Sequence, residues 1–347
     1  MDDGLNGRRL REAGALGLVV LAGLVAAALF VMLAGKDPLA TFRVMLGYAL
    51  GSGNGFAEVV VRAVPLCLAG LGVAVAFRCN VFNIGADGQI VVGAILAAAA
   101  VMAVPGLPGP LALAVFLACG IAGGAIYGGI AGWLRARFGV SEIIVTIMQN
   151  YIAIQFLTWM VRGPMQEAMG MFPRSDRLPD GAMLGLMVDG TRVHWGLALA
   201  LAATLIVHVA MRHSSFGFQV GVVGRNPLVA RFAGIADRRV VVLAMLASGG
   251  LAGLAGAVEI AGLHHRLQDD FAPGFGLLAI AVALLARLEP LAVPFSALLF
   301  GVLHVGSGAV QREIGLPFPV VWIFEAIVIF GCLGLGAVRA RTVRAAA

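Results

Sequence analysis

Residues 78–89 place polar side chains and two glycines between long apolar runs, and no other stretch of the sequence is better suited to chemistry. The side chains here that can hydrogen-bond a solute or the backbone are Asn80, Asn83, Asp87 and Gln89. In a membrane, irregular backbone is tolerated only where protein or a water-filled path covers it, and interrupted helices mark transport sites near the midplane. The segment is therefore predicted to face a path through the protein, and an ordinary cytoplasmic turn is the alternative.

Signatures of ATP hydrolysis, nucleophilic catalysis and metal binding are missing from the sequence. The one lysine, Lys36, does not belong to the Gly-Lys-[Ser/Thr] ending of a phosphate-binding loop. No GxSxG or HExxH motif occurs, the six histidines are scattered, and the four cysteines form no CxxC pair. We therefore expect no enzyme activity, no metal and no cofactor, so that any use of ATP requires a separate subunit.

Acidic residues inside apolar runs are the next candidates. Glu325 lies seven residues into the last run, roughly 10 Å deep at 1.5 Å per residue, so it must face protein or water. Glu259 is expected close to the outer end of its run, where it can reach water. Glu58 and Arg62 are spaced i, i+4 and are expected to satisfy each other.

Transmembrane helices are the elements that must position these residues. The chain of 347 residues is 61% hydrophobic and only 12% charged, against about 25% charged in soluble domains, and its mean hydropathy is +0.98. These values predict an all-α polytopic membrane protein that forms a single transmembrane domain over residues 1–347. At about 20 apolar residues per span, the ten expected spans are residues 13–34, 56–77, 89–104, 110–133, 143–161, 194–211, 240–261, 274–288, 293–310 and 318–337.

The arginines predict the orientation of these spans. Ten spans put four arginine clusters on one side, which the positive-inside rule assigns to the cytoplasm. Residues 1–12 and 338–347 are then cytoplasmic tails, residues 211–239 are the largest cytoplasmic loop, and residues 35–55 lie outside, partly at the interface. We interpret the net charge of +6 as a topology signal and expect no nucleic-acid partner.

Two further patterns concern helix geometry. In the loop 211–239, Asn226 is a predicted N-cap, Pro227 the first helical residue and Gly234 the stop signal of a short helix. Small residues at four-residue spacing allow helix backbones to approach closely; they are Gly120, Gly124, Gly128 and Gly132, with Gly249, Ala252, Gly253 and Gly256 in a later span. Breaks at 80–89 and 272–280 occupy comparable places in the two halves, which suggests an internal duplication.

Four stretches of the sequence also resemble a known family. Residues 80–89, NVFNIGADGQ, are similar to the FNIG-[AS]-[ED]-GQ signature of ABC-importer permeases for nucleosides and simple sugars, in the branched-chain amino acid and ribose permease superfamily. Residues 139–152, 224–235 and 274–285 resemble the same family in the same order.

The resemblance implies a permease subunit in a bacterial inner membrane, with both termini cytoplasmic. Its implied partners are a cytoplasmic ATP-binding subunit, a second and related permease chain, an extracytoplasmic solute-binding protein and membrane lipids. The coupling residues that it implies are Asn226, Pro227, Ala230, Arg231 and Gly234. The expected substrate path includes Asn80, Asn83, Asp87, Gln89, Phe275 and Glu325.

An ion-coupled secondary transporter for small polar solutes is the alternative function. It would use Asp87, Glu259 and Glu325 as ion carriers. The sequence does not distinguish among nucleosides and sugars as the solute.

Overall fold

The computed structural model describes residue 25, residues 28–104 and residues 106–315, and these are helical with no strand among them. Two isolated β-bridges join loop residues. The α-helices are α2 (Pro38–Leu50), α3 (Gly53–Arg78), α4 (Ala86–Ala103), α5 (Gly109–Phe138), α6 (Glu142–Arg162), α7 (Gly196–His213), α8 (Ser215–Arg225), α9 (Pro227–Phe232), α10 (Asp237–Glu259), α11 (Phe275–Leu285) and α12 (Val293–Ile314). The all-α membrane architecture is confirmed.

Two compact units make up the chain. The first contains residues 1–59 and 299–347, and the second contains residues 60–298. In the described part of the first unit, α2 begins at the N-cap Asp37 and packs against the end of α12, where a Cβ added at Gly306 would lie 2.4 Å from Met45 Cγ. The Arg312 guanidinium lies 5.1 Å from the centre of the Tyr48 ring. The expected interfacial segment 35–55 is thus largely a helix.

Seven helices among the described residues are long and apolar enough to cross a membrane. They correspond to seven of the ten expected spans. The span expected at 274–288 is wrong, because α11 has only 11 residues and extends about 16 Å, half of a hydrocarbon core of about 30 Å. Left-handed backbone at Gly274 and Arg287 bounds it, a feature that hydropathy does not register. Span 318–337 and nearly all of span 13–34 lie outside the described residues, so the count of ten stays a prediction.

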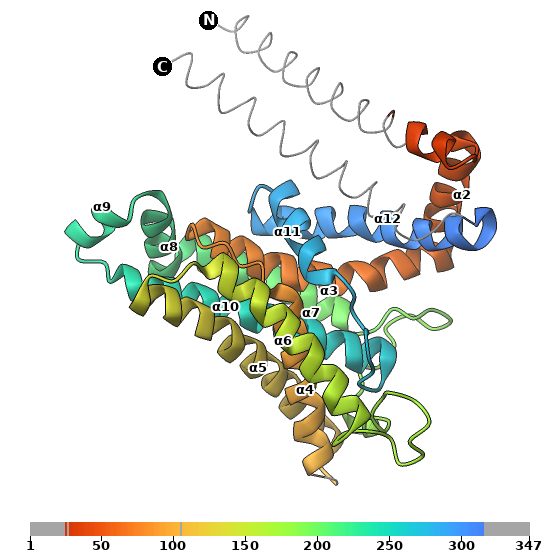
Figure 1. The fold of residues 1–347 in the computed structure, drawn as a ribbon, viewed down its shortest axis with the longest axis horizontal. Helices are drawn as coiled ribbons and strands as arrows, with labels where there is room; N and C mark the ends of the chain where they lie inside the picture. The colour runs from red at the N-terminus through yellow and green to blue at the C-terminus, as the bar shows by residue number, and fades with distance from the viewer. Residues whose placement is uncertain (1–24, 26–27, 105, 316–347) are drawn as a thin grey trace, which may run out of the picture. The chain divides into compact units, whose positions relative to one another are not determined.

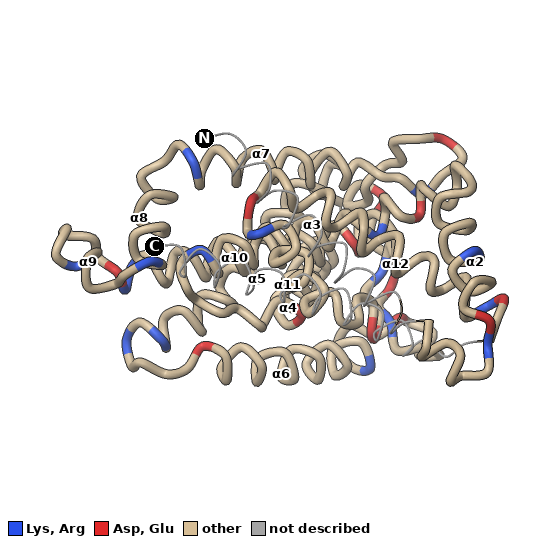
Figure 2. Tube along the Cα trace, turned by 90° about the horizontal axis from the view of Figure 1, so that it is seen from above, with Lys and Arg blue, Asp and Glu red and all other residues tan. Residues whose placement is uncertain are grey.

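The second unit is built around α4, α5 and α10, which pack against one another with α6 against α4 (Figure 1). Most of its charged residues lie toward the ends of the helices (Figure 2). This distribution is what a bilayer requires, because charge is costly at its centre.

Glycines bring α5 and α10 into backbone contact, as the spacing predicted. A Cβ added at Gly124 would lie 2.2 Å from the Gly249 carbonyl oxygen, and one added at Gly253 would lie 2.2 Å from that of Gly120. No side chain fits at such distances, so the two backbones touch directly and gain dispersion contacts over most of their length.

We predict that Gly124→Ala lowers the free energy of unfolding by about 1–3 kcal/mol, because its methyl group must push α5 away from α10. Gly221→Ala on α8 is the matched control, since an added Cβ there has no atom within 4 Å. Thermal unfolding of the purified chain in detergent measures both. Equal midpoints for the two variants would contradict the direct backbone contact.

Candidate functional site

The polar segment between α3 and α4 is an extended break in the bundle. Helix α3 ends at Arg78, and Asn80 takes up left-handed backbone with φ of 56°, a conformation that asparagine tolerates better than most residues. Helix α4 starts at Ala86 with Gly85 as its N-cap, which has no side chain to satisfy the first backbone N–H groups. The rest of the bundle must therefore supply the missing hydrogen bonds.

The Asn83 amide is the centre of this break. Its oxygen accepts hydrogen bonds from the Gly85 N–H at 3.0 Å and from Gln89 Nε2 at 3.0 Å. Its nitrogen donates to Gln89 Oε1 at 2.8 Å and to the Ser248 hydroxyl on α10 at 2.8 Å. Asn83 and Gln89 are completely buried. Both donors and both lone pairs of Asn83 are thus used within the protein.

Helix α6 clamps the start of α4. The Asn150 side chain accepts from the Gly88 N–H at 2.8 Å and donates to the Ile84 carbonyl at 2.8 Å. It therefore serves as a cap that comes from a different helix. Near the other end of the break, Glu142 accepts from the Phe82 N–H at 3.2 Å and forms an ion pair with Arg135 of α5.

The two predicted breaks meet at Asp87. Asp87 Oδ1 accepts from the Gly276 N–H at 2.6 Å, so an acidic side chain in the first turn of α4 caps the first turn of α11. A Cβ at Gly276 would lie 2.1 Å from the Asp87 backbone nitrogen. Only glycine permits this approach of the two helix N-termini.

Helix positions give the depth of the site. Ser248 is eleven residues into α10, about 16 Å from its start, and Asn150 is eight residues into α6, about 12 Å from its start. Against a core of about 30 Å, the part of the break from Asn83 to Gly88 lies near the middle of the bundle, whereas Phe82 lies at the start of α6 beside Glu142. Two helices that begin at this depth are the arrangement in which transporters place solute sites.

The predicted path residues differ in their exposure to solvent. Asn80 is exposed at the turn, Asp87 is partly exposed, and Asn83, Gln89 and Phe275 are buried. Glu325 lies outside the described residues.

Partners that sequence reasoning missed are Ser248, Asn150 and Glu142. Asn150 belongs to a stretch that carried the family resemblance, and Ser248 is a single polar residue in an apolar span. Both signals were present, but neither indicates which helix the side chain contacts.

Glu259 differs from its prediction. It is fully buried, with Arg62 Nη1 at 3.2 Å and His264 Nε2 at 3.3 Å from its Oε1. It does not reach water, because the chain continues past α10 through a wide helical turn, Ile260–His264, and α3 supplies Arg62. Arg62, which was expected to be satisfied by Glu58, forms an ion pair with Glu259 of α10.

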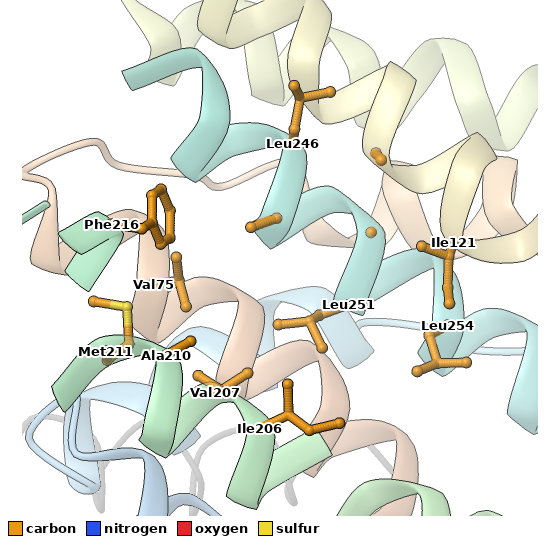
Figure 3. Close-up of a pocket in the computed structure, with 13 residues that line it drawn as sticks. Val75, Ile121, Ile206, Val207, Ala210, Met211, Phe216, Leu246, Leu251 and Leu254 are labelled. Carbon is orange, nitrogen blue, oxygen red and sulfur yellow. The ribbon is translucent and has the colours of Figure 1, made fainter. Parts of the chain in front are cut away.

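The pocket drawn in Figure 3 is not a site for a polar solute. It has a volume of about 310 Å³ and lies among α3, α5, α7, α8 and α10. Its labelled side chains carry carbon and the sulfur of Met211, with no oxygen or nitrogen. A sugar or nucleoside would leave its hydroxyl groups unpaired here, at a cost of roughly 1–3 kcal/mol each.

The predicted short helix in the loop 211–239 is confirmed as α9. The Asn226 side chain accepts from the N–H groups of Leu228 and Val229 at 2.9 and 3.3 Å, and Pro227 is the first helical residue. Gly234 has φ of +75° just after the helix. Arg231 binds Asp237 Oδ2 through two nitrogens, at 3.0 and 2.7 Å.

The side chains of α9 divide into a buried and an exposed set. Ala230, one of the expected coupling residues, is completely buried and is therefore not accessible to a partner protein. Phe232 is 93% exposed, and Leu228 and Val229 are also exposed. An apolar tip on a rigid, capped helix is suited to contact with another protein.

Comparison with known proteins matches residues 55–333 to a family described as "Branched-chain amino acid transport system / permease component". A glucose ABC transporter permease protein of Haloferax volcanii is 39% identical, with 90% of this chain and 84% of that protein covered. A guanosine ABC transporter permease protein of Bacillus subtilis is 34% identical, with 93% of each covered. A nucleoside ABC transporter permease protein of Lactococcus lactis is 31% identical, with 90% and 88% covered. Bacillus subtilis also has a second guanosine permease protein that matches this chain.

We predict that Asn83→Ala lowers the free energy of unfolding by about 1–3 kcal/mol for each buried group that it leaves unpaired. The groups affected are the Gln89 amide, the Ser248 hydroxyl and the Gly85 N–H. Asn80→Gly is the control, because glycine also adopts the left-handed conformation. Chemical or thermal unfolding in detergent distinguishes them, and an unchanged Asn83→Ala midpoint would exclude the network as a source of stability.

For Glu259→Gln we expect a loss of about 3–5 kcal/mol, because the partly buried Arg62 guanidinium loses the charge of the fully buried Glu259 carboxylate, 3.2 Å away. Glu289→Gln is the matched variant, since Glu289 also pairs with an arginine, Arg78 at 2.8 Å, but has a 45% exposed side chain. Its expected loss is within about 1 kcal/mol. Unfolding midpoints measured side by side test the difference, and a larger effect of Glu289→Gln would refute it.

Proposed function

This chain belongs to the family of branched-chain amino acid transport system permease components and is the permease subunit of an ABC importer, and we propose that its solute is a nucleoside or a related simple sugar. The observation that carries the proposal is the similarity over at least 90% of the chain to permeases named for guanosine, nucleosides and glucose. These solutes share hydroxyl groups on a sugar ring.

The paired helix N-termini supply a place for such hydroxyls in this proposal. Asp87 is the partly exposed acceptor at the point where α4 and α11 begin. Asn83 and Gln89 hold the backbone around it, and Asn80 and Phe275 bound the two breaks. On this assignment Asp87 contacts the solute, and the other residues determine where Asp87 stands.

Movement is coupled to ATP through α9 in this proposal. Phe232 and Leu228 contact the ATP-binding subunit, while Asn226, Pro227, Ala230 and Gly234 keep the helix in shape. The Arg231–Asp237 pair ties α9 to the start of α10, whose Ser248 contacts the Asn83 network. A movement of α9 is thus transmitted through α10 to the break.

The partners of this chain follow the family. An ATP-binding subunit supplies hydrolysis, and the two guanosine permease proteins of Bacillus subtilis favour a second, non-identical permease. A solute-binding protein would dock on the side opposite to α9. The orientation that places α9 and both termini in the cytoplasm rests on the positive-inside rule.

The test is purification of the tagged chain from its native membrane in mild detergent, followed by identification of its partners and by uptake of labelled guanosine and glucose in cells with and without the chain. We expect a stoichiometric ATPase, a second permease, and uptake that an uncoupler does not abolish while ATP is held constant. A homo-oligomer without ATPase, or uptake that collapses with the uncoupler, would instead indicate an ion-coupled transporter.

Phe232→Ala sharpens the same experiment. We expect it to lose most of the co-purifying ATPase and keep the second permease, because only the exposed tip of α9 changes. Leu205→Ala, an exposed apolar residue within α7, is the control and should keep both. Normal ATPase recovery with Phe232→Ala would place the contact elsewhere in the chain.

A further inference from the structure

A second pocket, of about 370 Å³, opens where the end of α5 meets the start of α10. We call it the arginine pocket and define it by Trp133, Ala136, Arg137, Arg238, Arg239, Val242 and Leu243. Three arginines line it together with an indole ring and three aliphatic side chains, and most of the lining surface is apolar. The functional proposal above uses none of these residues.

The glycine contacts between α5 and α10 create the charge density of this pocket. Because the two backbones touch, the last turn of α5, with Arg137, must lie beside the first turn of α10, with Arg238 and Arg239. Like charges at this distance repel one another. Arg238 and Arg239 also stand at a helix N-terminus, where the helix dipole disfavours cations and attracts anions.

The nearby carboxylates are engaged by other arginines. Asp237 binds Arg231, and Glu142 binds Arg135. Within the described ranges, neither Arg137 nor Arg238 nor Arg239 forms an ion pair with a carboxylate, although Asp237 lies near Arg238 in the sequence. All three are exposed. An anion from outside the chain would therefore offset their mutual repulsion.

An apolar strip leads away from the pocket along α5. Ile126, Ile130 and Trp133 are 60%, 44% and 52% exposed, and Arg137 follows at the same helical spacing. Leu243, 49% exposed, adds to the strip from α10. The spacing i, i+4, i+7, i+11 places these side chains on one face of the helix.

We propose that the arginine pocket binds the headgroup phosphate of an anionic phospholipid, with one acyl chain along the Ile126–Ile130–Trp133 face. One guanidinium group can donate two parallel hydrogen bonds to the oxygens of a phosphate, and indole rings prefer the level of the lipid headgroups. Basic pockets between the ends of transmembrane helices recognise anionic headgroups in this way.

An acidic protein surface is the competing occupant of the pocket. It would neutralise the charge of the three arginines but would leave the apolar strip without an apolar partner. A phospholipid satisfies both parts, because its phosphate is joined to an acyl chain that must lie along the helix toward the bilayer centre. The lipid is therefore favoured by the combination rather than by the charge.

Trp133 provides a direct probe of this site. In a full-length variant with Trp159, Trp195 and Trp322 changed to Phe, Trp133 is the single tryptophan of the four in the chain. The variant is reconstituted in phosphatidylcholine vesicles that contain a minor fraction of phosphatidylglycerol, with brominated acyl chains on one lipid or the other. We expect brominated phosphatidylglycerol to quench Trp133 fluorescence far beyond its share of the lipid.

Arginine variants then assign the effect to the pocket. Each of Arg137→Gln, Arg238→Gln and Arg239→Gln should lower the preference for phosphatidylglycerol about fivefold, and the triple variant should abolish it. Arg212→Gln, which removes a charge from the end of α7 outside the pocket, should leave the preference unchanged.

A readout without tryptophan substitutions guards against a misfolded probe. Mass spectrometry of the otherwise unchanged chain, purified in mild detergent, should find phosphatidylglycerol retained, and the triple arginine variant should lose it. Equal quenching by both brominated lipids together with no retained phosphatidylglycerol would overturn the proposal. So would a triple variant that keeps its lipid preference but loses the ATPase, which would identify the pocket as a protein interface.

Discussion

A polar amide in the middle of an apolar bundle must find every one of its hydrogen bonds inside the protein, and Asn83 is the residue to which this constraint applies most strictly here. In a bilayer no water replaces a missing partner. The four bonds of Asn83 therefore join the break after α3 to the first turn of α4 and to α10. Asn150 of α6 hydrogen-bonds the Gly88 N–H at the start of α4, and the Gly276 N–H of α11 hydrogen-bonds the Asp87 carboxylate. Five helices thus meet at one irregular segment because none of them alone can satisfy it.

Close backbone packing makes these bonds possible. Ser248 reaches Asn83 only because α10 lies against α4 and α5, and the glycines at Gly93, Gly124 and Gly253 remove the side chains that would hold these helices apart. The same approach forces Arg137 and Arg238 together at the ends of α5 and α10. Packing in the centre and charge density at the end of the bundle are therefore two consequences of a single interface.

The position of the break suits an importer that changes its open side. A helix that begins near the midplane points its first backbone N–H groups there, and α4 and α11 both do so, with Asp87 between them. Ion pairs such as Arg62–Glu259 lie elsewhere in the second unit and are tied down by burial. The charged groups suited to holding helices together are thus separated from the one partly exposed carboxylate at the break.

The sequence alone determined the class of the protein, because hydropathy, arginine placement and helix signals are local properties. It predicted the irregular segment 78–89, the capped helix at Asn226 and the close approach of the glycine-rich spans. Only the tertiary structure decided which side chains face one another: Asn83 with Gln89 and Ser248, Asp87 with Gly276, Arg62 with Glu259. It also showed that α11 is half a span, with left-handed backbone at Gly274 and Arg287 on either side of it. These outcomes depend on contacts between residues as many as 197 positions apart, and no local pattern encodes such pairs.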